Sequence, residues 1–339
     1  MRLPPIKYAK TSDGYSIAYA VTGEGLPLVL TPHAFSHIQL YWQEQTFLTP
    51  WLEGLSSRFR LVQFDWRGQG MSTRGLRDDF MPSDLLADIE AVIETLALDR
   101  FILVGIGGPA HATVRYAEKN PSKVAALILF SFSAEPGAWS LGMFRNLPAE
   151  NWDVFLESQV PHGLSPEETQ RALSRLRQTV DQRDWLIRVA KDQSADLHAF
   201  LAGVQSPTLV VHPREYRMPS EDACRRLAAR IPGAIFASTA GRSVLGNTDE
   251  GLGVIDDFLK SIDGLSYLGG AAAEQQGTGL SQRQMEVLQL LAAGRTNREI
   301  AEALVLSERT VQRHISDIYT RLSVRNRAEA TAYALTLRR

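Results

Sequence analysis

Five short apolar runs alternate with helical patterns over residues 1–262. The runs are Leu28–Thr31, Leu61–Phe64, Phe101–Val104, Leu127–Phe130 and Thr208–Val211. Segments such as Pro82–Leu96 and Ala110–Lys119 have the apolar spacing of helices. Apolar strands separated by helices are typical of a mostly parallel sheet that is covered on both faces. The pattern therefore predicts that this part of the chain is an α/β domain.

The stretch from about residue 135 to residue 205 interrupts this alternation. It has helical spacing and contains Trp139, Trp152 and Trp185. In parallel sheets, ligands bind beyond the carboxyl ends of the strands. A helical insertion at this place is expected to form a lid over a pocket.

Residues 264–279, GLSYLGGAAAEQQGTG, lack apolar periodicity and are typical of a flexible linker. We therefore expect a first domain over residues 1–262, a linker over 263–279 and a second domain over 280–339. The second domain shows four helical segments, each preceded by a residue that can cap it. These capping residues are Ser281, Thr296, Ser307 and Asn326, of which Ser281, Thr296 and Asn326 are followed three positions later by Gln284, Glu299 and Glu329. The sequence predicts a small all-α domain of four helices.

Charge is distributed unevenly between the two predicted domains. The chain as a whole has a net charge of −2. Residues 280–339 contain ten arginines, no lysine and six acidic residues, for a charge of +4, which leaves −6 on the remainder. A basic domain beside an acidic one favours contact with an anion such as nucleic acid, although a solvated helical surface has the same charge.

Cysteine content and apolar runs restrict the class of protein. A single cysteine, Cys224, excludes an internal disulfide and a cysteine-based zinc site, and we expect neither a metal nor a cofactor. The N-terminal residues have no apolar segment typical of a signal peptide. The longest apolar run, near Val124–Phe132, is far shorter than the ~20 residues that a membrane helix needs. We expect a cytoplasmic protein without membrane contact.

Several motifs in the first domain occur in the order of a known fold. "SDGYSIAYAVTGEGLPLVLTPHAF" is similar to a first hairpin and an oxyanion-loop strand, and "LVQFDWRGQGMS" is close to D-x-R-G-x-G-x-S. "FILVGIGGPAH", "PSKVAALILFS" and "SPTLVVHP" follow. On these motifs, residues 8–262 resemble the α/β-hydrolase fold over nearly their whole length. The resemblance implies a nucleophile on a strand-to-helix elbow, with a histidine and an acid as partners.

All three catalytic positions carry other residues in this chain. The nucleophile position corresponds to Gly107, the acid position to Tyr216 and the histidine position to Arg242. Glu215, one residue before Tyr216, leaves a shifted acid open. Other side chains with relevant chemistry lie away from the elbow or have no obvious partner: Ser131, Ser133, Cys224, His33 and His111. We expect no enzyme activity, with a DNA-tethered enzyme of non-triad mechanism as the alternative.

A glycine at the elbow leaves space that a small molecule can occupy without being cleaved. We expect the pocket residues to be His33, Ala34, Phe35, Trp42, Ile106, Gly107, Gly108, Trp139, Tyr216 and Arg242. A guanidinium near a dry pocket needs a partner. Glu215, Asp249, Glu250 or a ligand carboxylate could supply it, so we expect a small, largely apolar effector with an acceptor or anionic group. In the alternative, Gly107 and Pro109 only tighten a turn in a scaffold without ligand.

The second domain carries the most complete motif of the chain. Ile300, Ala301 and Leu304 form one apolar stripe, and Val311, Ile315, Ile318 and Leu322 form the next at helical spacing. Two such helices with a tight turn make a bihelical DNA-reading unit. The run "GRTNREIAEALVLSERTVQRHISDIYTRL" matches the LuxR-type helix-turn-helix signature, and residues 280–337 resemble that family. Gln284 and Gln312 depart from residues common there.

The resemblance implies a partner, double-stranded DNA. Gln312, Arg313 and Ser316 match positions that contact base edges, and Gln and Arg favour adenine and guanine. The residues better placed for phosphate are Thr296, Asn297, Arg309, Thr310 and His314. His314 could equally be a packing residue.

The last helix, Asn326–Leu337, has Ala328, Ala332 and Leu335 on one side. In the family the corresponding helix often pairs with its twin, so we expect a homodimer on a near-palindromic operator. The alternative is packing within one domain. The combined expectation is a ligand-responsive transcription regulator, an activator that contacts RNA polymerase. A constitutive regulator whose large domain serves only assembly is a further alternative.

Overall fold

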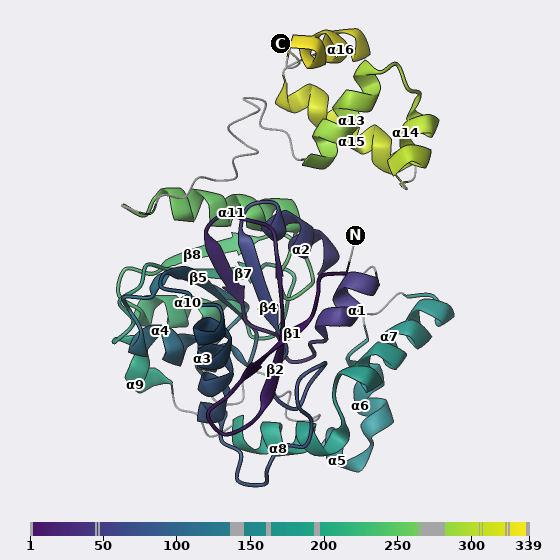
Figure 1. Ribbon diagram of the computed structural model, residues 1–339. Coiled ribbons are helices and arrows are strands. Elements are labelled where there is room, and N and C mark those ends of the chain that lie inside the picture. The colour runs from purple at the N-terminus through teal and green to yellow at the C-terminus, as the bar shows by residue number, and fades with distance from the viewer. Residues whose placement is uncertain are drawn as a thin grey trace. The chain divides into compact units, whose positions relative to one another are not determined.

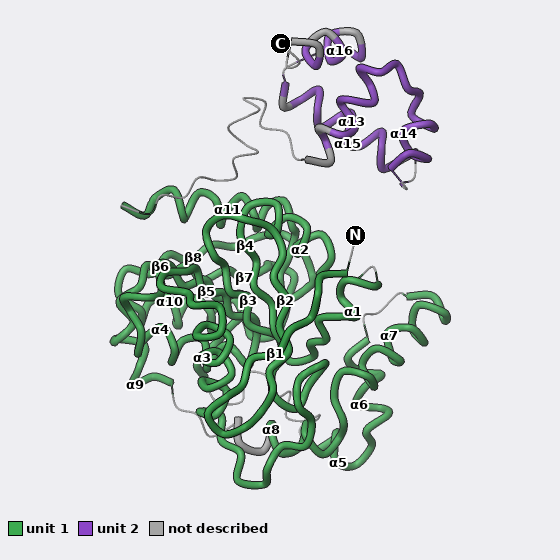
Figure 2. Tube along the Cα trace, viewed as in Figure 1, with its two compact units in different colours: residues 1–267 green, residues 268–339 purple. Residues whose placement is uncertain are grey.

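The computed structural model divides the chain into two compact units, residues 1–267 and 268–339 (Figure 2). The described residues are 3–44, 46, 48–135, 146–160, 164–192, 197–263, 265, 282–304, 306, 308–322, 324 and 326–336. Most of the expected linker and Trp139 therefore lie outside the described residues.

The described part of the first unit is built on one eight-stranded sheet with the order β1-β2-β4-β3-β5-β6-β7-β8 (Figure 1). The strands are β1 (Lys7–Lys10), β2 (Ser16–Thr22), β3 (Pro27–Leu30), β4 (Arg60–Phe64), β5 (Phe101–Ile106), β6 (Val124–Phe130), β7 (Thr208–Pro213) and β8 (Ile235–Thr239). β2 runs antiparallel to β1 and β4, and the remaining pairs are parallel. The predicted mostly parallel sheet is confirmed.

Helices cover both faces of this sheet. One face carries α3 (Leu85–Thr95), α4 (Ala110–Lys119) and α10 (Glu221–Arg230), whose apolar side chains share a core with Ile17 and Leu103. The other carries α1 (Ile38–Gln43), α2 (Thr49–Ser56) and α11 (Thr248–Lys260), which pack on Ala18 and Ile102. β5, β6 and β7 are buried at every position, and β5 and β6 are therefore continuous apolar runs rather than alternating ones.

The described residues between β6 and β7, within the stretch expected to be inserted, are mostly helical. Their helices are α5 (Leu147–Glu150), α6 (Trp152–Ser158), α7 (Pro166–Thr179), α8 (Gln182–Asp192) and α9 (His198–Leu201). Ser165 and Glu168 cap α7 reciprocally, and Pro166 occupies its first position. Phe155, Leu156, Leu173, Val180 and Trp185 form a small core of their own. We call α5–α8 the lid.

The described part of the second unit is helical. It consists of α13 (Gln282–Ala292), α14 (Asn297–Leu304), α15 (Glu308–Arg321) and α16 (Arg327–Thr336), which surround one apolar core. The predicted reciprocal cap of Thr296 and Glu299 is confirmed: the Glu299 N–H donates to Thr296 Oγ1 at 3.3 Å, and the Thr296 N–H to Glu299 Oε2 at 2.7 Å. The predicted caps Ser281 and Ser307 fall outside the described residues.

None of the described helices in either unit combines the length and the apolar character needed to cross a bilayer.

Candidate functional site

The turn between β5 and α4 is the sharp elbow that the sequence predicts. Gly107 has a φ of 64°, in the left-handed region that favours glycine. Its N–H donates to the Phe130 carbonyl at 3.0 Å, and its carbonyl accepts from the Ala110 N–H at 3.0 Å. Gly105 lets α4 approach the strand, because a Cβ there would lie 2.8 Å from the Ala110 Cβ. The elbow is kept, and its tip carries no side chain.

The position expected for the acid is occupied by a neutral side chain. Tyr216 follows β7 and is partly buried, and burial raises its pKa to about 12. Its neighbour Glu215, the candidate for a shifted acid, is exposed and bound to Arg242. Neither residue lines the two cavities described below.

The expectation that Arg242 borders a dry pocket is wrong. Its side chain is 88% exposed and pairs with Glu215, with 2.9 Å between Nε and Oε2. Solvent satisfies the remaining guanidinium donors, so the charge is never desolvated and needs no ligand carboxylate. Of the other suggested partners, Glu250 instead accepts from the Ala240 N–H at 2.7 Å.

The loop after β3 contains a closed ring of hydrogen bonds. The Phe35 N–H donates to His33 Nδ1 at 3.1 Å, and His33 Nε2 lies 2.6 Å from the Tyr41 hydroxyl. The same hydroxyl donates to the Phe35 carbonyl. Since Nδ1 is an acceptor, the imidazole proton is on Nε2 and points to Tyr41. Burial lowers the pKa of His33 to about 4 and raises that of Tyr41, so both groups are neutral near pH 7.

The lid covers this loop through aromatic contacts. The Phe35 ring stacks on Trp185, with centroids 4.5 Å apart and planes 11° from parallel. Phe155 contacts both rings, at 6.3 and 5.2 Å between centroids. Ala34 packs against the same cluster. Phe35 and Ala34, expected in the pocket, therefore contact the lid directly.

Two small cavities lie near the elbow. The first, of about 20 Å³, is lined by His33, Tyr41, Asp65 and Ile106 among others. The second, of about 10 Å³, is apolar and includes Trp51 and Phe130. Each has room for about one water molecule, whereas a drug-sized ligand needs a pocket of about 300 Å³ or more. Residues of the sheet and of the loop after β3 line the first cavity, and no described residue of α5–α8 lines either one.

The remaining expected pocket residues are distributed around these cavities. Ile106 lines the first cavity, and Gly107 and Gly108 follow it in the chain. Trp42 lines neither: it is buried in the core, and its indole N–H donates to Gln63 Oε1 at 2.9 Å. The structure therefore brings His33 and Ile106 to the first cavity, Phe35 to the lid and Trp42 to the core.

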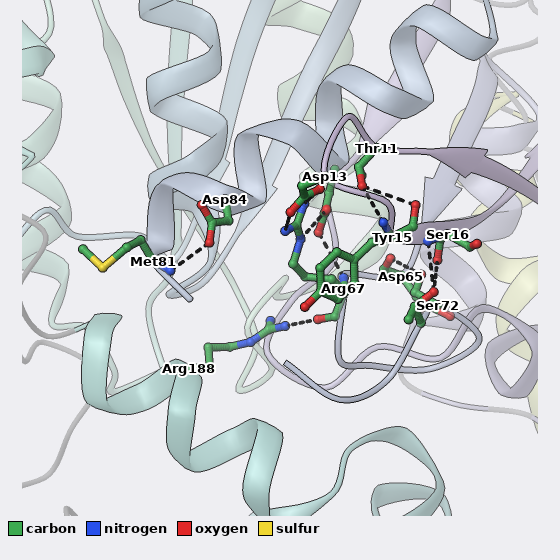
Figure 3. Close-up of polar contacts among 12 residues, drawn as sticks. Thr11, Asp13, Tyr15, Ser16, Asp65, Arg67, Ser72, Met81, Asp84 and Arg188 are labelled. Carbon is green, nitrogen blue, oxygen red and sulfur yellow. Dashed lines mark hydrogen bonds and ion pairs between the residues drawn. The ribbon is translucent and has the colours of Figure 1, made fainter. Parts of the chain in front are cut away.

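The D-x-R-G-x-G-x-S segment forms a buried polar network that sequence reasoning did not identify (Figure 3). Arg67 is fully buried, with its Nε 2.7 Å from Asp88 Oδ1 and its Nη1 2.6 Å from Asp13 Oδ2. Its guanidinium also lies over the Tyr15 ring, 4.4 Å from the centroid. The side chains of this motif are engaged in holding the loop rather than directed at the elbow.

Asp65, the first residue of the motif, binds backbone groups on both sides of the loop. It accepts from the N–H groups of Ile38 at 3.1 Å and Met71 at 2.9 Å. Burial raises its pKa to about 6. The Ser72 hydroxyl donates to the Asp65 carbonyl at 2.6 Å and accepts from the Ala18 N–H at 2.9 Å. A carboxylate in this position is a structural acceptor.

In the second unit, α15 presents a polar face opposite its buried one. Val311, Ile315 and Ile318 are buried, whereas the expected base-contacting residues Gln312, Arg313 and Ser316 are exposed. Of the expected phosphate-contacting residues, Thr296 caps α14, Asn297 begins it, and Thr310 and His314 are partly buried on α15. The side chain of Arg309 lies outside the described residues.

Comparison with known families matches both units. Residues 278–334 match the model of bacterial regulatory proteins of the luxR family, and residues 27–184 match the alpha/beta hydrolase fold. The chain carries an α/β-hydrolase domain and a LuxR-family domain. The helical second unit and the sheet of the first agree with this assignment.

Curated relatives match one domain each. The chain is 35% identical over 107 residues to the transcriptional regulatory protein LiaR of Bacillus subtilis, which is 32% of this chain and 46% of LiaR. It is 29% identical over 121 residues to the AB hydrolase superfamily protein YclE of the same organism, which is 35% of this chain and 40% of YclE. The chain thus covers less than half the length of either relative.

Solved structures match the α/β-hydrolase domain. An enol-lactonase from Burkholderia xenovorans matches with a TM-score of 0.62 and 18% identity, over 75% of this chain and all of that one. A bromoperoxidase from Bacillus anthracis matches with a TM-score of 0.64 and 18% identity, over 76% of this chain and 100% of the bromoperoxidase. At this identity the likeness establishes the fold alone.

Proposed function

We propose that this protein is a ligand-responsive transcription regulator. In this proposal the α/β-hydrolase domain binds a small molecule without converting it, and the LuxR-family domain binds double-stranded DNA. Two domains with these family matches in one chain support the coupling of a small-molecule pocket to DNA binding. The effector must favour one state of the protein over another, since a ligand with equal affinity for both transmits nothing.

The observation that carries the proposal is the backbone of Gly107. Its left-handed φ of 64° keeps the elbow that the fold uses to present a nucleophile, and the tip has no side chain. The fold's hydrolytic route needs a nucleophile, a base and an orienting acid. Tyr216 at the acid position is neutral, and Arg242 at the histidine position is on the surface.

Binding without turnover also fits the state of His33. His33 is neutral, and its two ring nitrogens are used by Phe35 and Tyr41 in the hydrogen-bonded ring. His33 therefore stabilises the loop and has no free ring nitrogen for proton transfer to a substrate. The aromatic walls supplied by Phe35 and Trp185 suit a small, largely apolar effector. Gly108, which follows the elbow tip, is the backbone donor we propose for an acceptor group on that effector.

For the DNA-binding half, we propose that Gln312, Arg313 and Ser316 contact base edges in the major groove. All three are on the exposed face of α15, and their side chains can read bases there. We further propose that the protein binds a near-palindromic operator as a homodimer and activates transcription through RNA polymerase. These last steps rest on the LuxR-family match.

The DNA-binding test is a mobility-shift titration of the full chain against fragments of its own promoter region. The variant Arg313→Ala is expected to lose about 1–3 kcal/mol of binding and to relax preference at one base position. Arg171→Ala removes the same charge from an exposed ion pair on the lid and serves as the control. Equal binding by wild type and Arg313→Ala would exclude the proposed role of Arg313.

The ligand test is native mass spectrometry of the full chain purified from its own host. A defined added mass that is released on denaturation supports the sensor proposal. The same preparation is assayed on a panel of activated p-nitrophenyl esters. Sustained turnover that disappears in a pocket variant such as Phe35→Ala would replace the sensor by the DNA-tethered enzyme.

A further inference from the structure

The corner between α7 and α8 is tied to one loop of the sheet domain, residues 67–76. The Asp184 carboxylate, near the start of α8, accepts from two consecutive backbone groups, the N–H of Gly75 at 2.8 Å and of Leu76 at 2.7 Å. Asp184 is 1% exposed. A Cβ at Gly68, whose φ is +77°, would lie 3.3 Å from Asp184 Oδ2. The loop is therefore shaped to receive this carboxylate.

Further bonds join the same two segments. The Gly70 N–H donates to the Thr179 carbonyl at the end of α7, at 2.8 Å. Arg183 Nη1 donates to the Leu76 carbonyl at 2.7 Å, and Arg188 donates to the Arg67 carbonyl (Figure 3). Most of these bonds use backbone groups of the loop, so they fix its position as well as that of the lid.

This loop and Asp65, which precedes it, hold the segment after β3 in turn. The Gln69 side-chain amide donates to the Ala34 carbonyl, and Asp65 accepts from the Ile38 N–H. On the lid side, Trp185 follows Asp184 directly and stacks on Phe35. Two adjacent lid residues thus contact the loop and Phe35 at the same time, and one movement of α8 would release both.

The cavity that the described residues form beside this loop is too small for a ligand larger than a water molecule. The cavity beside His33 and Ile106 measures about 20 Å³. Trp185 is buried, and its indole N–H has no hydrogen-bond partner among the described residues, which is unfavourable for the closed state. An incoming molecule with an acceptor group could satisfy that donor once the lid moves.

From these contacts we propose that Asp184 is a latch that holds the lid closed, and that the effector binds only to the unlatched form. The inference rests on the proposed sensor function and adds its regulation. Apparent affinity falls with the fraction of protein in the binding-competent state. The strength of the Asp184 contacts to Gly75 and Leu76 therefore sets the effector concentration at which the protein responds.

The test uses the full chain and the variant Asp184→Asn, which keeps the side-chain volume and weakens the two bonds. Hydrogen exchange followed by mass spectrometry is expected to speed up about tenfold in peptides covering residues 68–78 and 164–192, and to be unchanged in β5 and β6. Asp78→Asn is the control, because Asp78 makes an exposed ion pair with Arg183 at the same seam, 2.8 Å long. It should stay within about twofold of wild type.

Binding is measured with the dye 8-anilinonaphthalene-1-sulfonate as the probe. Asp184→Asn is expected to bind it about tenfold more tightly than wild type and Asp78→Asn. Phe35→Leu, which weakens the stack and leaves Asp184 intact, should also bind the dye more tightly while Gly75 and Leu76 stay protected. If Asp184→Asn also loses protection in β5 and β6, the whole domain is destabilised, and Phe35→Leu is then the variant that tests the proposal.

The outcomes separate the latch from the sensor. Unchanged exchange in residues 68–78 and 164–192 of Asp184→Asn overturns the latch, whatever the protein binds. A second outcome is faster exchange in residues 68–78 and 164–192 of Asp184→Asn, with the dye affinity of Asp184→Asn and Phe35→Leu equal to that of wild type. This result would support the latch contacts but overturn their link to ligand uptake. It would also count against the sensor proposal.

Discussion

His33 Nε2 and the Tyr41 hydroxyl lie 2.6 Å apart and close a ring that returns to Phe35. Both nitrogens of the His33 imidazole take part in this ring and hold the loop, and the Phe35 side chain of the same loop packs against the lid. The same three residues therefore connect the protonation of His33 to the packing of Phe35 against the lid.

Tyr41→Phe is expected to destabilise the protein by about 1–3 kcal/mol, because the change removes the hydroxyl that pairs with the partly buried His33 ring and the Phe35 carbonyl. Urea unfolding at pH 7 measures the difference. Tyr8→Phe is the control, since Tyr8 is about half exposed on β1 and should change stability little. Equal losses in the two variants would show that the ring contributes nothing.

The contribution of His33 to stability is expected to vary with pH. Its pKa is about 4 in the fold against 6.5 ordinarily, so between these values the unfolded chain binds more protons. The free energy of unfolding therefore rises with pH through that window and falls as acid is added. Asp65, with its pKa raised from 3.8 to about 6, acts in the opposite direction.

Comparing wild type with His33→Phe isolates the contribution of His33 to stability, because Asp65 is present in both proteins. The gap in free energy of unfolding between wild type and variant is expected to be widest above pH 6.5 and to narrow toward pH 4. Urea titrations at four or five pH values measure it. If this difference in free energy of unfolding stays constant between pH 4 and pH 6.5, the pKa of His33 is the same in the folded and unfolded states, and the prediction is wrong.

Arg67→Ala is expected to cost about 3–5 kcal/mol, because it leaves the fully buried Asp88 carboxylate without its cation. Arg58→Ala removes a partly exposed ion pair with Asp256 and should cost less than about 1 kcal/mol. Thermal and urea unfolding of both variants give the comparison. A cost for Arg67→Ala as small as that for Arg58→Ala would contradict the tight pairing.

Two glycine-to-alanine changes should have opposite signs. In Gly105→Ala the new Cβ meets the Ala110 Cβ at 2.8 Å, and overpacking is expected to cost about 1–3 kcal/mol. Gly253 lies within α11 with no atom within 4 Å of its would-be Cβ. Gly253→Ala should stabilise by up to about 1 kcal/mol through helix propensity. Melting temperatures that move in the same direction would contradict this description of the elbow.

The sheet and its covering helices were accessible from sequence because burial on both faces leaves a simple signature. The strands β5 and β6 are uninterrupted apolar runs, and α4 begins and ends where the sequence predicts. β8 was not among the predicted strands, because it is an edge strand whose first residue, Ile235, is half exposed. Edge strands lack the continuous apolar pattern of central ones.

The site was less accessible, since its contacts join residues far apart in the chain. The elbow was identified from its glycines, but the exposure of Arg242 depends on Glu215, which lies on a different loop. Nothing in the local sequence of α8 marks Asp184 as a partner of Gly75 and Leu76, 108 or more residues away. The D-x-R-G-x-G-x-S motif was the sequence signal for the buried network around Arg67. It was interpreted only as a mark of the fold, so the network was not predicted.

Asp184 and Trp185 face different partners from adjacent positions on one helix, the loop after β4 on one side and Phe35 on the other. Each residue of an α-helix is rotated by roughly 100° from the one before it. A single insertion or deletion within the first turn of α8 would therefore swing both side chains away from their partners together. The length of that turn should be invariant among orthologues, with insertions confined to segments farther from the seam.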